Sequence, residues 1–121
     1  MMAEQDAAAH IGPDRCGHPN DVDRRRIERA LAHRARYRYV RPTVRAAACG
    51  YCIESPCCSR HVDDGGATIL IAWIEFVPAS GCWRLYWRDH AQQAWRGHAE
   101  YVALAALLGD LNTDRARVFW P

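Results

Sequence analysis

The residues best suited to chemistry form a short cluster in the middle of the chain: Cys49, Cys52, Cys57, Cys58 and His61. A Cys-x-x-Cys pair at a tight turn can present two thiolates to one zinc ion, and nearby cysteine or histidine side chains can complete a tetrahedron. The cluster therefore predicts a Zn²⁺ site. The alternative is a set of structural thiols, because adjacent Cys57 and Cys58 would point to opposite faces of a strand and one of them would be buried.

The same cysteines could instead react as thiolates. Arg60 and His61 follow Cys57 and Cys58 closely and would favour the ionised thiol. A nucleophilic site also needs an orienting group and a site for the developing oxyanion, and no motif supplies either one. The N-terminal residues do not resemble a secretory signal, so we expect reduced thiols and a cytoplasmic location.

A second constellation is basic and aromatic. Residues 24–45 hold nine arginines and one acid, so this stretch carries a charge of +8, while residues 1–23 carry −4 and residues 46–121 carry −2. Arginine pairs with phosphate as a planar fork, and the interleaved Tyr37 and Tyr39 could stack on bases. The stretch predicts a nucleic-acid or other polyanion surface made by Arg24, Arg25, Arg26, Arg29, Arg36 and Arg38. The alternative is a solvated helix face in a chain whose 16 basic residues are all arginine.

Enzymatic chemistry has less support than binding. The chain has no lysine, which excludes a Schiff-base lysine and a Walker phosphate loop. Asp89 and His90 could form an acid–base pair, but adjacent residues rarely orient one another. No motif combines a nucleophile, a base and a stabilising site, so we name no catalytic residue.

The elements that must position these groups indicate an α+β fold. Asn20 and Asp21 are typical of a helix start, and Pro42 prevents a helix from continuing past Arg41. Alternating apolar residues and turn signals predict an antiparallel sheet of about four to five strands, followed by a C-terminal helix. The expected elements are a helix of about 15 residues from Asn20, strands over 44–48, 51–55, 68–77, 83–88 and 95–98, and a helix over 101–111.

The strand over 68–77 is apolar on both faces, so we place it at the centre of the sheet. Strict alternation puts Leu70, Ala72, Ile74 and Phe76 on one face and Ile69, Ile71, Trp73 and Val77 on the other. Core packing is the expected role of the tryptophans. If no helix covers the second face, however, that face would need a partner subunit.

The domain boundaries follow from the same patterns. Residues 1–19 show no sustained period and indicate a flexible tail, in which Cys16 and His18 are expected to be solvated. Residues 20–121 are expected to form a single domain, and no apolar run is long enough to span a membrane.

The second half of the chain resembles a known bacterial family. The carrying residues are the strand Ala72–Phe76, the run Trp83-Arg84-Leu85-Tyr86-Trp87, Trp95, a leucine-rich helix, Asp114 and the terminal pair Phe119-Trp120. The resemblance is to domain-of-unknown-function family three-thousand-twenty-four and is specific over residues 72–120. It implies a fold and assigns no mechanism to any residue.

Three functional hypotheses remain at this point. The leading one is a non-enzymatic domain that binds a protein partner or a second copy of itself. The second is a nucleic-acid or polyanion binder that uses the arginine-rich segment. The third is a zinc-binding or thiol-active protein that uses the cysteine-rich hairpin.

Overall fold

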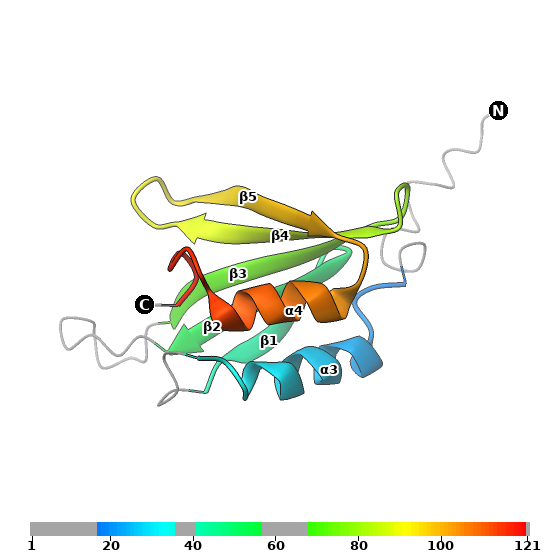
Figure 1. The fold of residues 1–121 in the computed structure, drawn as a ribbon, viewed down its shortest axis with the longest axis horizontal. Coiled ribbons are helices and arrows are strands. Elements are labelled where there is room, and N and C mark those ends of the chain that lie inside the picture. Colours follow the sequence, from blue (N-terminus) through cyan, green and yellow to red (C-terminus); the bar gives the residue numbers. More distant parts are fainter. Residues whose placement is uncertain (1–16, 36–40, 57–67, 121) are drawn as a thin grey trace.

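One helix, five consecutive strands and a second helix make up the part of the chain that the computed structural model describes, residues 17–35, 41–56 and 68–120. The fold is α+β, as the sequence predicts (Figure 1). The elements are α3 (Asp21–Leu31), β1 (Thr43–Ala47), β2 (Gly50–Pro56), β3 (Thr68–Val77), β4 (Cys82–Asp89), β5 (Ala94–Tyr101) and α4 (Leu104–Thr113).

The strands form one antiparallel sheet in the order β1-β2-β3-β4-β5, so each strand pairs with its neighbour in sequence. The doubly apolar segment is the central strand β3, with the predicted bounds. Helices α3 and α4 lie side by side on the same side of the sheet (Figure 1). No described helix lies on the other side, so the helices of the described residues cover one sheet face only.

Helix α3 is shorter than the predicted 15 residues. Its start is as expected, since the Asn20 side chain accepts a hydrogen bond from the Asp23 backbone N–H at 2.8 Å. It ends at Leu31 because Arg34 turns back into the core. The Arg34 guanidinium donates to the Leu31 carbonyl oxygen at 2.7 Å and lies 4.9 Å from the ring centre of Trp120.

The core lies between the helices and the covered sheet face. Strict alternation along β3 proves wrong, because the register between β2 and β3 shifts beside Ile53 and Glu54. This irregularity lets both Ile71 and Ala72 reach the core, where each is almost completely buried. Leu70 stays outside the core cluster on the uncovered face.

Strand β5 is longer than the predicted segment 95–98. It continues to Tyr101, which the sequence pattern assigns to the following helix. Helix α4 begins only at Leu104, and its leucines pack on the sheet. A second register shift, between Leu85 and Tyr86, explains why the β5 pattern is weak: it interrupts the alternation that marks a strand.

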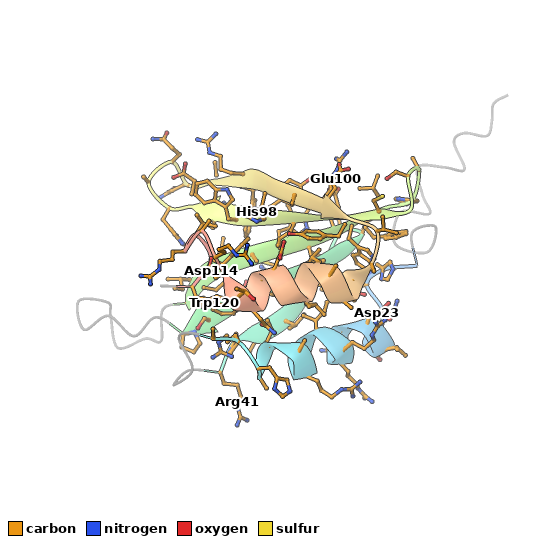
Figure 2. All side chains as sticks on the ribbon, in the orientation of Figure 1. Asp23, Arg41, His98, Glu100, Asp114 and Trp120 are labelled. Carbon is orange, nitrogen blue, oxygen red and sulfur yellow. The ribbon has the colours of Figure 1, made fainter. Side chains whose placement is uncertain are left out.

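The segment after α4 docks on the core, and Asp114 organises it (Figure 2). The buried Asp114 carboxylate accepts hydrogen bonds from the backbone N–H groups of Val118 at 2.9 Å, Phe119 at 3.2 Å and Trp120 at 2.9 Å. The Trp120 indole also donates to the Leu111 carbonyl oxygen at 2.9 Å. Asp114 and the terminal aromatic residues therefore have a structural role.

His18 is not the solvated tail residue that the sequence suggests. It is 9% exposed, and its Nδ1 atom lies 2.8 Å from the Tyr51 hydroxyl oxygen. Its ring contacts Trp83 with a centroid separation of 4.6 Å. The packed domain thus begins before Asn20. Cys16 lies outside the described residues.

Neither described helix has the length and apolar character needed to cross a membrane.

Candidate functional site

The uncovered side of the sheet is the candidate site, and we call it the open face. Side chains alternate along each strand, and the strand register shows which of them share this face. Trp73 is opposite Tyr86, Glu75 is opposite Arg84, and Arg84 is in turn opposite Glu100. The larger and charged members of the open face are Arg45, Cys52, Glu54, Leu70, Trp73, Glu75, Arg84, Tyr86, Arg88, Trp95 and Glu100.

Three aromatic rings form a continuous cluster on the open face. Trp73 stacks on Tyr86 with ring centroids 4.4 Å apart and planes 22° from parallel. Trp73 also lies 6.2 Å from Trp95, and the Arg88 guanidinium lies 5.2 Å from the centre of the Trp95 ring. All four side chains are partly exposed. Large aromatic area and a cation over a ring are features that stabilise contacts with other molecules.

The tryptophans therefore divide between the two sides of the sheet. Trp83 and Trp120 are buried on the helix side, and Trp87 packs against the same core. These three fit the predicted packing role. Trp73 and Trp95 do not, because the strand order places them on the side away from the helices. The sequence indicates this division within β4, where Trp83, Leu85 and Trp87 occupy every second position and therefore share one face of the sheet.

Ion pairs lie on either side of the aromatic cluster. Arg45 Nε donates to Glu54 at 2.7 Å across β1 and β2, and Arg84 Nε donates to Glu100 at 2.7 Å across β4 and β5. Glu100 projects from β5 at the margin of the sheet (Figure 2). Sequence reasoning misses these pairs because it does not fix which strands are neighbours. Adjacent strands place opposite charges within reach of each other.

The interior of the open face carries one more polar contact. The Tyr86 hydroxyl donates to Glu75 at 2.7 Å. Burial raises the pKa of Tyr86, and the hydrogen bond to Glu75 adds to this effect. Tyr86 therefore stays a neutral donor at physiological pH, with its ring held flat against Trp73.

The predicted zinc ligands are not assembled in the described residues. Cys49 is disulfide-bonded, which differs from the expectation of reduced thiols and removes its thiolate. Cys52 is a free thiol but is buried, and burial raises its pKa although Arg45 is close by. Cys57, Cys58 and His61 lie outside the described residues. In the part of the chain that is described, no three histidine, cysteine or acidic side chains lie close enough to hold a metal ion.

The predicted polyanion surface is partly neutralised by acids on its own helix. Arg24 pairs with Asp21 at 3.3 Å and Arg26 pairs with Asp23 at 2.8 Å, while Arg25 is exposed. Arg29, in the last turn of α3, is also exposed, and Arg36 and Arg38 lie outside the described residues.

Asp89 and His90 do not form an acid–base pair. The Asp89 carboxylate accepts the backbone N–H of Gln92 at 3.1 Å and Nε of Arg96 at 3.1 Å. The hydrogen bond from Gln92 lowers the pKa of Asp89, and Arg96 lowers it further. His90 is exposed at the turn, so Asp89 serves to shape the β4–β5 turn.

These features define a small α+β domain in which two helices cover one face of a five-stranded antiparallel sheet. The chain belongs to the family described as domain of unknown function DUF3024, whose model matches residues 16–121. No curated protein matches the sequence, and no solved structure does. The match confirms the family resemblance that the sequence shows, which is specific over residues 72–120.

Proposed function

We propose that this protein acts by binding another protein chain through the open face. One observation carries the proposal: the described helices α3 and α4 lie on the same side of the sheet, and the other side presents Trp73, Tyr86 and Trp95 partly exposed. Tryptophan, tyrosine and arginine are the residue types that contribute most to binding energy at protein interfaces. A sheet face that carries such a cluster gains by excluding water against a second surface.

The charges of the open face favour a protein over a polyanion. Its charged side chains, among the described residues, are three arginines and three glutamates, and two of the arginines are paired with glutamates (Arg45, Glu54, Glu75, Arg84, Arg88 and Glu100). Binding of nucleic acid gains most of its affinity from unpaired positive charge. The open face instead combines an apolar centre with polar groups at its margin, which is typical of a protein interface.

A site-specific photo-crosslinker tests the proposal. Benzoylphenylalanine in place of Arg88 would lie on the open face beside Trp95. The matched control places the same residue at Val102, which is 85% exposed and lies between β5 and α4. Irradiation of the producing cells is expected to give discrete crosslinked protein products from position 88 and not from position 102.

Mass spectrometry of the products identifies the crosslinked chain, whether it is this protein or another one. Absence of any product from position 88, or the same products from both positions, would overturn the proposal.

A further inference from the structure

We infer that the occupant of the open face is a second copy of this chain, packed sheet against sheet around a two-fold axis. This inference rests on the proposed function and names the partner. Homodimers with two-fold symmetry are the most frequent soluble oligomers, and their interfaces must be self-complementary. The open face meets that requirement in charge, in geometry and in area.

Charge is the first argument. The charges that the described residues place on this face, three arginines and three glutamates, sum to zero, so two identical faces can meet without net repulsion. A face whose charges were all of one sign would repel its own copy and would select an oppositely charged partner. Balanced charge gives no such selection, and it leaves the aromatic cluster as the main source of attraction.

The arrangement of these charges is the second argument. The Arg45–Glu54 pair lies on β1 and β2, and the Arg84–Glu100 pair lies on β4 and β5, with β3 between them. A two-fold axis along β3 brings the β1–β2 side of one copy over the β4–β5 side of the other. Because such an axis preserves position along the strands, Arg88, one residue past the Ala72–Trp87 pair on β4, then comes over Glu54 of the other copy, which is opposite Leu70 on β2, so opposite charges meet across the interface.

Area is the third argument. Strands about 4.8 Å apart that rise about 3.3 Å per residue give this five-stranded sheet a face of roughly 600 Å². Two such faces bury about 1,200 Å² in total, which is the lower limit for a specific stable interface. We therefore expect a reversible dimer with a dissociation constant in the micromolar range.

Sedimentation equilibrium on the full chain at low salt tests the inference with a charge-swapped pair. Arg88→Glu leaves two arginines and four glutamates on the face, and Glu100→Arg reverses this balance. Each variant alone is expected to dimerise at least tenfold more weakly than the wild-type chain, because each face then carries a net charge and repels its own copy. Their equimolar mixture is expected to regain the dimer.

The control is Arg25→Glu, an exposed change on α3 that alters net charge on the helix side of the sheet and should leave dimerisation unchanged. Circular dichroism melting of each variant separates loss of fold from loss of association. A wild-type chain that stays monomeric at millimolar concentration, or a mixture that fails to recover, would overturn the inference. If crosslinks from position 88 then lead to a different protein, the proposed function stands with another occupant; if no crosslinks form, both fail.

Discussion

Asp114 is the residue on which the C-terminal segment depends. Its buried carboxylate accepts the backbone N–H groups of Val118, Phe119 and Trp120. Asp114→Ala leaves these donors without that acceptor, so we expect the free energy of unfolding to fall by about 3 kcal/mol. Urea denaturation measures this change.

The control for this prediction is Asp110→Ala. Asp110 is exposed, and its carboxylate accepts a hydrogen bond from the Tyr101 hydroxyl at 2.7 Å. Its loss should cost less than about 1 kcal/mol. Equal effects of the two substitutions would contradict the structural role of Asp114.

His18 makes the stability of the fold depend on pH. Burial lowers the pKa of His18 below 6.5, and the Asp23 carboxylate at 3.6 Å opposes only part of this effect. The unfolded chain therefore binds a proton more readily than the folded chain. Stability should be highest above pH 6.5 and should fall as the pH drops through 6.5 toward the lower folded-state pKa.

The measurement is the urea midpoint between about pH 8 and about pH 5.5, for the wild-type chain and for His18→Gln. We expect the wild-type midpoint to fall more steeply with acid. His33→Gln, a change at an exposed position, should keep the wild-type slope. Parallel slopes for the wild-type chain and His18→Gln would show that His18 does not have this role.

At the scale of the elements, Gly50 sets how closely β2 approaches β3. A Cβ atom at Gly50 would collide with the Ile74 carbonyl oxygen, which is part of the rigid backbone of β3. Gly50→Ala should therefore reduce the free energy of unfolding by about 3 kcal/mol or more. In Gly97→Ala, by contrast, the added Cβ meets no atom within 4 Å, and the expected change is within about 0.5 kcal/mol. A Gly50→Ala protein as stable as Gly97→Ala would contradict this packing.

Helix α3 offers a separate test of polyanion binding. Because Asp21 and Asp23 pair with Arg24 and Arg26, the helix presents less free positive charge than its sequence suggests. We therefore expect the wild-type chain to bind heparin weakly. It should elute below about 0.15 M salt, a range in which salt screens surface charges only weakly. Retention well above that concentration, lost in Arg25→Glu, would instead favour the arginine-rich segment as a binding surface.

The sequence predicts the elements whose signals are local. Strand β3 has the predicted bounds, because its apolar run ends at clear turn residues. The sequence predicts that α3 ends before Pro42 but not that it ends at Leu31, because that end involves Arg34 lying against Trp120 from the far end of the chain. The role of His18 depends in the same way on Tyr51, a partner distant in sequence.

The candidate site could be predicted only in outline. Apolar residues at successive positions predict that both faces of β3 are apolar, and this suggests an uncovered surface. It does not show that both helices lie on one side, or that Arg84 meets Glu100. Those facts depend on strand order and on the crossing of helices, which are set by packing across the whole chain.

At the scale of the whole molecule, the two sides of the sheet differ: α3 and α4 cover one side, and no described helix covers the other. The helix side buries a continuous core that includes Tyr51, Leu85 and Leu107. The open side keeps its aromatic cluster partly exposed and its charges balanced. From this asymmetry we propose that the open side is where the protein meets a second copy of itself.

Fluorine NMR on the chain labelled with fluorotryptophan tests this claim most directly, because the five tryptophans report on both sides of the sheet. Trp73 and Trp95 lie on the open face, whereas Trp83, Trp87 and Trp120 lie on the helix side. On dilution from millimolar to low micromolar concentration, we predict that the Trp73 and Trp95 resonances shift while the other three stay in place. Shifts confined to the helix-side tryptophans, or no shift at any of the five, would contradict the account.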